Sequence, residues 1–381
     1  MRILIIPSWY PTKTNRILGS FFREQALMLK KQGHDVSVIK VDLHAVSERI
    51  ENKIEEFDDE GIHTIIKHVH SWGFARDSRL LCTVLKWHYK KLFNILLEHS
   101  FNPDIIQAHS FLPAGYIACY LGDKSKTPVI VTEHSSIVHS GKLNKDGLSI
   151  LKYVTNNSDC FVCVSESLKR KVVELTGQNN IKVLPNNLSS EFYYKHSKCS
   201  ETFGFVCVGN LIDHKRQDLL IDCFVKAFGN GEEELYLAGQ GVNYSNLKEK
   251  IIKLKMNKRI HLLGPLSRKE VAELLNRQDV FCLLSISETF GVAYIEALAC
   301  GCPVLATKNG GADELIDDSN GILVDVDDDE EIVKALNKIR KEYDSYDLEN
   351  ISQNCIKKYS ESAVYKQTIQ LYDLVISKYK R

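Results

Sequence analysis

The chain lacks the features that mark membrane, secreted and nucleic-acid-binding proteins. No apolar run in its 381 residues approaches the roughly 18 residues that span a bilayer. The apolar stretch at residues 3–6 is too short for a signal peptide, and no small-residue cleavage site follows it. Lysine plus arginine and aspartate plus glutamate each number 49, so the whole chain has no basic signature for nucleic acid. These absences predict a cytoplasmic protein without a nucleic-acid partner.

Two common nucleotide-binding motifs are also missing. The sequence contains no GxxxxGK[ST], which excludes a P-loop ATPase. The loop at residues 7–19 follows the first apolar run but lacks G-x-G-x-x-G, so a standard nicotinamide-dinucleotide site is poorly supported there.

Cysteine is plentiful, with 11 residues, but its pattern does not indicate a disulfide framework. The count is odd, and many cysteines lie inside apolar runs, which fits a reducing compartment. Cys160 and Cys163 have the spacing of a zinc or redox pair, but no second pair with matching spacing completes four ligands. We therefore expect buried thiols rather than a metal site.

Short β-type runs alternate with helix-type runs along the whole chain, which indicates parallel sheets with crossover helices. The strands are expected near residues 2–6, 36–41, 62–69, 104–108, 129–132, 160–164, 181–184, 203–208, 235–238, 260–263, 280–284, 304–306 and 321–324. At about 150 residues per domain, the length suggests two domains. The predicted fold class is therefore α/β, with two doubly wound domains in tandem.

The domain boundary is expected where periodicity disappears. We predict a first domain at residues 1–188, a linker at 189–201 and a second domain at 202–361, with a C-terminal helix at about 362–381 that packs back on the first domain. Ligands in doubly wound sheets bind beyond the carboxyl ends of the strands, at the switch point of the strand order. We therefore expect the active site in a cleft between the two domains.

Two segments of the second domain have the features of a phosphate site. A loop carrying Glu288 follows a strand, and a helix then begins at about Gly291, whose first amides are unpaired and positively polarised. Glu296 lies one turn into this helix, where it could reach a ribose. Lys215 follows another strand and supplies a cation for a pyrophosphate. The plainer alternatives are that Glu296 is a surface carboxylate and Glu288 a helix cap.

In the first domain two histidines end predicted strands. His134 is expected to point into the cleft, with a core histidine as the alternative. His109 either touches an acceptor or caps the following helix. The other eleven histidines are expected at the surface.

Together these segments resemble family 4 of the retaining glycosyltransferases, a group with the GT-B fold of two Rossmann-like domains. The most specific mark is the E-x7-E pair of Glu288 and Glu296, followed by the residues at 297–304. The segments at 209–215, 237–241 and 261–266 are also similar, as is the opening at 7–33 with Gly19 before a helix. The resemblance covers nearly the whole chain.

The resemblance implies a role for each matching residue. Lys215 would neutralise the donor pyrophosphate, Glu288 would bind the donor sugar near the reacting carbon, and His134 would lie against that sugar, so these three are the predicted catalytic residues. Glu296 would bind the ribose hydroxyls. The remaining donor-binding residues are predicted to be Gly19 at the β-phosphate, Pro265 and Leu266 at the nucleobase, Thr289, Phe290, Gly291 and Val292 at the phosphate and sugar, and Asn210, where many family members have arginine.

The implied reaction is transfer of a sugar from a nucleotide-sugar donor, with a UDP-sugar favoured, to a glycan or lipid-linked glycan acceptor in surface polysaccharide biosynthesis. No D-x-D pair lies in a suitable loop, so we expect neither a metal nor another cofactor. The alternatives are a sugar-nucleotide epimerase or hydrolase on the same fold, and a non-catalytic sugar-nucleotide-binding partner.

The segment at residues 79–93 is basic, apolar and aromatic. It could lie on an anionic membrane at the inner face of the cell and meet a lipid-linked acceptor there. Its broad apolar stripe favours the alternative, a crossover helix packed on the sheet.

Overall fold

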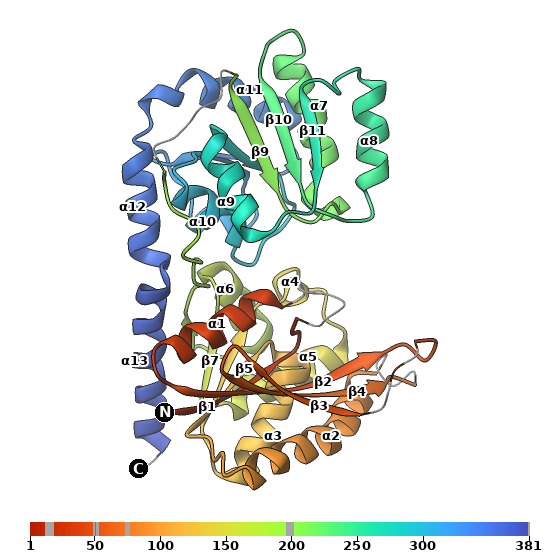
Figure 1. Cartoon of the computed structure of the whole chain (residues 1–381), viewed down its shortest axis with the longest axis vertical. Coiled ribbons are helices and arrows are strands. Elements are labelled where there is room, and N and C mark those ends of the chain that lie inside the picture. The colour runs from red at the N-terminus through yellow and green to blue at the C-terminus, as the bar shows by residue number, and fades with distance from the viewer. Residues whose placement is uncertain (12–18, 49, 51–52, 73–76, 196–201, 380–381) are drawn as a thin grey trace. The chain divides into compact units, whose positions relative to one another are not determined.

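The structure is a computed structural model that describes residues 1–11, 19–48, 50, 53–72, 77–195 and 202–379. The chain divides into two compact units, Met1–Pro185 with Val364–Arg381 and Asn186–Ala363. Each unit is a sheet covered by helices (Figure 1). Two segments lie outside the described residues. They are residues 12–18, in the first predicted loop, and residues 196–201, at the end of the predicted linker.

The first unit contains an eight-stranded sheet in the described residues, with the strand order β3-β4-β2-β1-β5-β6-β7-β8. β3 pairs with β4 in the antiparallel sense, and the other neighbouring strands in this described sheet are parallel. The strands are β1 (Arg2–Pro7), β2 (Asp35–His44), β3 (Ile54–Asp59), β4 (Ile62–His70), β5 (Ile105–His109), β6 (Val129–Glu133), β7 (Cys160–Cys163) and β8 (Ile181–Val183).

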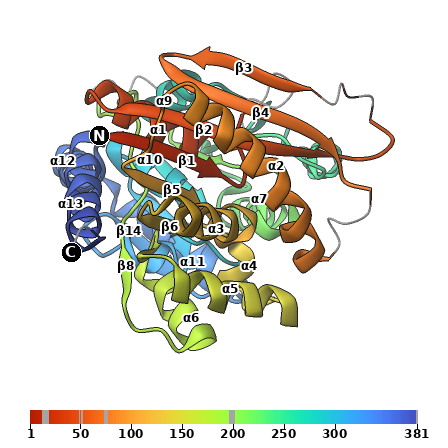
Figure 2. The ribbon, with the colours of Figure 1, turned by 90° about the horizontal axis from the view of Figure 1, so that it is seen from below.

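Helices of the first unit connect these strands and cover the sheet. They are α1 (Ser20–Lys31), α2 (Ser78–Glu98), α3 (Tyr116–Ser125), α4 (Ser136–His139), α5 (Lys145–Asn157) and α6 (Glu166–Thr176), with a π-helical turn at Phe111–Gly115. α2 packs on β2, β4 and α3 (Figure 2). The central strands form because their runs of aliphatic residues are buried on both faces, as in β1 and β5.

The final helix of the described chain, α13 (Glu361–Tyr379), contributes to the core of the first unit. Val364, Tyr372 and Val375 are buried with Ile3 and Val36 in one apolar cluster. The first unit is therefore built from both ends of the chain.

The second unit contains a six-stranded parallel sheet in the described residues, with the order β11-β10-β9-β12-β13-β14. The strands are β9 (Gly204–Val208), β10 (Glu234–Ala238), β11 (Ile260–Gly264), β12 (Val280–Leu283), β13 (Val304–Thr307) and β14 (Gly321–Val324). The helices are α7 (Gln217–Phe228), α8 (Tyr244–Lys253), α9 (Arg268–Arg277), α10 (Val292–Ala299), α11 (Asp329–Lys341) and α12 (Leu348–Tyr359).

The predicted fold class, two tandem α/β domains with parallel sheets, is confirmed. β3 has no counterpart among the predicted strands, because its sequence Ile-Glu-Glu-Phe-Asp-Asp has four acidic residues. Such charge is usual at the edge of a sheet, where it discourages pairing with another chain. Cys160 and Cys163 lie in β7 as free thiols. No helix in the described part of the chain has both the length and the apolar character to cross a bilayer.

Candidate functional site

The switch point of the second sheet lies between β9 and β12, where the strand order reverses direction. The loops that follow these two strands are joined there. The imidazole of His214 donates from Nε2 to the carbonyl oxygen of Ser287 at 2.6 Å, and the amide of Ile286 donates to the carbonyl oxygen of His214 at 3.0 Å. The fold thus brings together segments about 70 residues apart at the position where parallel sheets bind ligands.

Lys215 and Glu288 form an ion pair across these two loops. Their side chains are only 19% and 13% exposed, so water screens the pair poorly. A 3₁₀ turn at Asp213–Lys215 positions the lysine, and the amide of Glu288 donates to the carbonyl oxygen of Asn309 at 2.9 Å. No side chain caps α10, so the alternative of Glu288 as a helix cap is wrong.

Gly291, the N-cap residue of α10, has the left-handed conformation, with φ of 84°. A Cβ at this position would overlap the ring of Tyr294, so both the backbone angle and the close approach require glycine. Thr289 and buried Phe290 lead into this turn, and Val292 is the first residue of the helix. The amides at the N-terminus of α10 carry the positive end of the helix dipole, three residues beyond Glu288.

Glu296 is buried in α10, and the alternative of a surface carboxylate is therefore wrong. Its carboxylate lies 3.1 Å from the guanidinium of Arg268, which begins α9 and stacks over the ring of Phe192 at 5.1 Å. Arg268 was not among the predicted site residues. In the sequence, what marks Arg268 is its position at the start of a helix, directly after Ser267, which is the N-cap of a capping box.

Asn210 is exposed, and its carbonyl oxygen accepts a hydrogen bond from the side chain of Gln217 at 3.0 Å. Arg216 does not take the place of the arginine that many family members have at position 210. Its guanidinium donates to the carbonyl oxygen of Val326 and lies 3.9 Å from carboxylate oxygens of Asp327 and Asp329. Lys215 is thus the cation that the structure places beside Glu288.

The predicted nucleobase segment follows β11, whose last residue, Gly264, has a φ of 76°. Pro265 is exposed and Leu266 is partly buried. The amide of Gly239, after β10, donates to the carbonyl oxygen of Gly264 at 2.8 Å. The loops at the carboxyl ends of β9, β10 and β11 are therefore tied side by side.

The switch point of the first sheet lies between β1 and β5. The amide of Ser8, after β1, donates to the carbonyl oxygen of His109 at 3.2 Å. Gly19 is the N-cap residue of α1, with φ of 72°, and a Cβ there would lie 2.5 Å from the carbonyl oxygen of Trp9. Glycine is therefore required where the first loop meets α1.

His109 and His134 lie together at this switch point, with His109 Nδ1 and His134 Nε2 3.2 Å apart. The ring of Phe22 stacks on His109 and meets His134 edge-on, and Phe21 lies beside His134. Burial lowers the pKa of His109 to about 3, and burial followed by the nearness of His109 lowers the pKa of His134 well below its usual value. Both imidazoles are therefore neutral at pH 7.

The prediction for His109 needs correction. Its side chain is fully buried, and no side chain caps the turn that follows it, so the alternative of a helix cap is wrong. The contact of His109 with an acceptor stays a prediction. His134 follows directly after β6 as predicted, is partly exposed, and its Nδ1 has no hydrogen-bond partner among the described residues.

Glu133 is a buried carboxylate of this region that sequence reasoning missed. It accepts hydrogen bonds from the amides of Phe111 at 2.7 Å, His134 at 2.9 Å and Ser135 at 2.6 Å. Burial raises the pKa of Glu133, and these hydrogen bonds oppose that effect. The carboxylate thus joins the end of β6, including His134, to the turn after β5.

The predicted membrane segment forms most of α2. Its apolar stripe, which includes Leu81, Leu85, Tyr89 and Leu92, is buried, as the crossover-helix alternative requires. Trp87 remains 65% exposed on the other side, with the ammonium of Lys67 over its ring at 4.9 Å.

Two family models match the chain, one after the other. Residues 18–191 match Glycosyltransferase Family 4, and residues 191–358 match Glycosyl transferases group 1. An uncharacterised glycosyltransferase of Methanocaldococcus jannaschii is 33% identical over 223 residues, which cover 58% of this chain and 61% of the relative. The phosphatidylinositol N-acetylglucosaminyltransferase GPI3 subunit of Saccharomyces cerevisiae is 26% identical, over 60% of this chain and 53% of the relative. The match thus spans less than two thirds of the length of these relatives.

The N-acetyl-alpha-D-glucosaminyl L-malate synthase of Bacillus anthracis is 27% identical over 60% of this chain and 62% of its own length. Among solved structures, a sucrose-phosphate synthase from Thermosynechococcus elongatus superposes with a TM-score of 0.79 at 16% identity, over 99% of this chain and all of that one. The Anabaena protein HepE in complex with UDP-glucose gives a TM-score of 0.72 at 16% identity, over 97% and 99% of the two chains. At this identity the structural likeness concerns the fold.

Proposed function

Since this chain belongs to the glycosyltransferases, with family models that together match residues 18–358, we propose that it is a retaining enzyme with a UDP-sugar as donor. The observation that carries the proposal is the pairing of Lys215 and Glu288 at the switch point, three residues before the N-terminal turn of α10. This arrangement combines a cation and oriented amides, which is what a leaving pyrophosphate requires.

The ion pair between Lys215 and Glu288 would open when the donor binds, so that each of the two side chains contacts the donor instead. The pyrophosphate carries more negative charge than one carboxylate, so it competes for the ammonium of Lys215. Glu288 is then left with lone pairs that accept hydrogen bonds from hydroxyls of the donor sugar. The amides of Gly291 and Val292 hold phosphate oxygens, and Gly291 lets them approach the backbone.

Glu296 and the segment after β11 would bind the nucleoside. The carboxylate of Glu296 accepts from the ribose hydroxyls, and Arg268 holds that carboxylate in place at 3.1 Å. Pro265 and Leu266 line the nucleobase. Because Asn210 is neutral and Arg216 is engaged with Val326, the phosphate clamp depends on Lys215 more than in relatives with an arginine at position 210.

The first unit would bind the acceptor. His134 is a partly exposed and neutral group, suited to a hydrogen bond with an uncharged sugar hydroxyl. Gly19 would approach the β-phosphate. The acceptor hydroxyl attacks from the face on which the pyrophosphate leaves, and the leaving phosphate takes its proton. Neither a dedicated base nor a metal ion is needed at the reacting carbon.

The acceptor is proposed to be a glycan or lipid-linked glycan of surface polysaccharide assembly. Exposed Trp87, with the basic residues of the same helix, supports a peripheral contact with an anionic membrane. For the donor, we place N-acetylglucosamine and glucose first, because relatives are named for transfer of N-acetylglucosamine and a structural neighbour binds UDP-glucose.

The test is a turnover screen with UDP-, GDP- and ADP-sugars, with and without lipid-linked and free glycan acceptors, in which release of the nucleoside diphosphate is measured. We expect release of UDP that depends on acceptor, retention of the anomeric configuration by NMR of the product, and no stimulation by added Mg²⁺ or Mn²⁺. A saturating nucleotide at about 100 times its dissociation constant adds about 2.7 kcal/mol of stability, and Glu296→Ala should remove that thermal shift.

Each rival function predicts a different outcome. Release of UDP at the same rate without any acceptor would indicate a hydrolase, and conversion of the sugar while UDP stays attached would indicate an epimerase. A thermal shift with UDP but no turnover across the panel would indicate a non-catalytic binding partner.

A further inference from the structure

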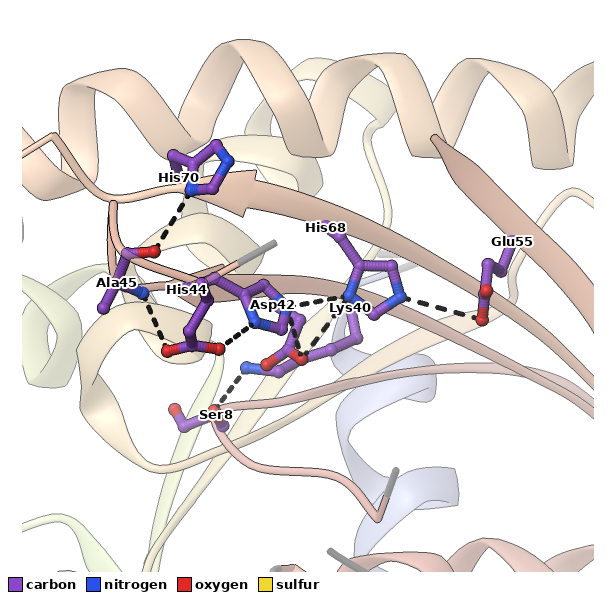
Figure 3. A network of polar contacts seen from close by, with 9 residues as sticks. Ser8, Lys40, Asp42, His44, Ala45, Glu55, His68 and His70 are labelled. Atoms are coloured by element: carbon purple, nitrogen blue, oxygen red, sulfur yellow. Dashed lines mark hydrogen bonds and ion pairs between the residues drawn. The ribbon is translucent and has the colours of Figure 1, made fainter. Parts of the chain in front are cut away.

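Three side chains of the first unit converge at the carboxyl ends of β2 and β4. These strands are parallel neighbours, and their register places Asp42 opposite His68 and His44 opposite His70. Because alternate residues of a strand share a face, Asp42, His44 and His68 lie on the same face of the sheet. Figure 3 shows their polar groups directed toward one another. None of the three belongs to the donor site described above.

The three ligand-type atoms form a compact triangle. His44 Nε2 lies 2.9 Å from His68 Nδ1 and 3.2 Å from Asp42 Oδ2, and His68 Nδ1 lies 3.6 Å from Asp42 Oδ2. A tetrahedral zinc ion about 2.0–2.1 Å from each ligand requires separations of about 3.3–3.4 Å between ligand atoms. The triangle therefore matches one face of a zinc coordination tetrahedron.

Each histidine also has a carboxylate near its other ring nitrogen. Glu48 lies 2.9 Å from Nδ1 of His44 and also accepts the amide of Ala45 at 3.0 Å. Glu55, on β3, lies 3.7 Å from Nε2 of His68. Metal-binding histidines have this arrangement, because an outer carboxylate fixes the tautomer and raises the basicity of the ligating nitrogen.

Hydrogen bonds alone do not account for this arrangement well. A neutral imidazole carries one N–H, and that of His44 is directed to Glu48. His44 Nε2 then points a lone pair at the region where His68 Nδ1 and Asp42 Oδ2 also lie. Three ligand-type atoms thus lie around one point. Lys40, on the same strand face, directs its ammonium to the carbonyl oxygen of Ser8 at 2.6 Å (Figure 3).

We propose that Asp42, His44 and His68 form a zinc-binding site, with water at the fourth position. Two imidazoles and a carboxylate are ligands that suit zinc rather than magnesium or calcium. The ion joins β2 to β4 and so closes the chain between residues 44 and 68, which stabilises the carboxyl edge of the first sheet. The side chains are 18–23% exposed, so the site is accessible to the ion.

A second group, formed by Glu56, His63 and His99, serves as a matched control. It also combines two histidines with one carboxylate, here a glutamate, but its side chains are 31–47% exposed and its two imidazoles stack at a centroid distance of 5.5 Å. One oxygen of Glu56 contacts both histidines, at 2.7 and 3.2 Å. Loss of His63 removes an exposed histidine without touching the proposed site.

The experiment is a zinc titration of the full chain after treatment with EDTA and desalting, in competition with a chromophoric chelator. We expect one zinc ion per chain in the wild type, at least a 100-fold loss of affinity in His68→Ala and Asp42→Asn, and an unchanged affinity in His63→Ala. Glu48→Gln should weaken binding by about 10- to 100-fold, as loss of an outer carboxylate usually does. Zinc should raise the melting temperature of the wild type and not that of His68→Ala.

Cobalt identifies the ligands independently. The visible spectrum of the Co²⁺-loaded chain should be that of nitrogen and oxygen ligands, without a thiolate-to-cobalt charge-transfer band, and should disappear in His68→Ala. If His68→Ala does not fold, the zinc affinity of Glu48→Gln is compared with that of the wild type instead. The proposal is overturned if the wild type fails to compete with the chelator for zinc, if His63→Ala loses affinity as much as Asp42→Asn, or if the cobalt spectrum indicates thiolates.

Discussion

The switch points of the two units have the same topology and opposite chemical character. In the second unit the loops after β9 and β12 bring together Lys215 and Glu288, two charged groups that remain partly exposed. In the first unit the ends of β5 and β6 bring together His109 and His134, two neutral imidazoles packed on Phe22. The parallel sheet determines where a site lies, and the few residues after each strand determine what charge it can bind. An anionic pyrophosphate suits the second unit and an uncharged sugar suits the first.

The largest effect is expected from removal of the cation in the second unit. Lys215→Ala should lower kcat/KM by about 100- to 1,000-fold, or about 3–4 kcal/mol, because it removes charge stabilisation of the leaving group. Lys215→Arg should keep part of the activity. Lys308→Ala, which breaks an exposed pair with Asp325 in the same unit, should leave the rate unchanged. Equal rates for Lys215→Ala and the wild type would show that Lys215 does not stabilise the charge of the leaving group.

A second comparison concerns Gly19 and Gly291, the N-cap residues of α1 and α10 at the two switch points. Gly19→Ala should lower the free energy of unfolding by about 2–3 kcal/mol, because a left-handed residue acquires a Cβ that meets the backbone of Trp9. Gly291→Ala should cost a similar amount, since the ring of Tyr294 is fully buried and its hydroxyl is held by Asn309. Gly33→Ala, with φ of 83° and no neighbour within 4 Å, is the control, at about 1 kcal/mol. Denaturant unfolding measures all three, and a cost for Gly33→Ala that equals that of Gly19→Ala would contradict the contact argument.

The neutral histidines of the first unit predict a loss of stability in acid. The pKa of His109 is about 3 in the folded chain and near 6.5 when unfolded, so the unfolded chain binds more protons between these values. Stability is therefore present above pH 6.5 and falls as the pH is lowered, by about 2 kcal/mol between pH 7 and pH 5 from His109 alone.

Urea unfolding at several pH values tests this slope. It should be reduced in His109→Gln. His88→Gln should reduce it less, because the side chain of His88 keeps more contact with solvent than the fully buried side chain of His109. A slope that persists in His109→Gln would show that other groups carry the acid sensitivity.

The smallest effect is expected at the buried carboxylate of α10. Glu296→Gln should weaken binding of UDP about tenfold, or about 1.4 kcal/mol, because a charge-assisted hydrogen bond to the ribose becomes a neutral one. Glu249→Gln, on the exposed side of α8, should have no effect. Calorimetric titration with UDP gives both values, and unchanged affinity in Glu296→Gln would remove Glu296 from the nucleoside site.

The sequence predicted the alternation of strands and helices, and with it the loops that carry Lys215 and Glu288, because both depend on local patterns. It could not predict which side chains meet. Arg268 on α9 forms an ion pair with Glu296 on α10. Glu133 accepts a hydrogen bond from the amide of Phe111, in the turn after the neighbouring strand β5. Fewer of the histidines are surface residues than predicted, because the pairing of His44 with His68 depends on the register between β2 and β4, which no local pattern specifies.

The contribution of α13 to the first core has a consequence for synthesis of the chain. Ile3 and Val36 emerge from the ribosome before the second unit, but Val364, Tyr372 and Val375, which pack with them, emerge after it. Domains usually fold in order of their appearance during translation. Here the second unit, at residues 186–363, can complete its core first, and the first unit must keep apolar surface uncovered until residues 364–375 have been made.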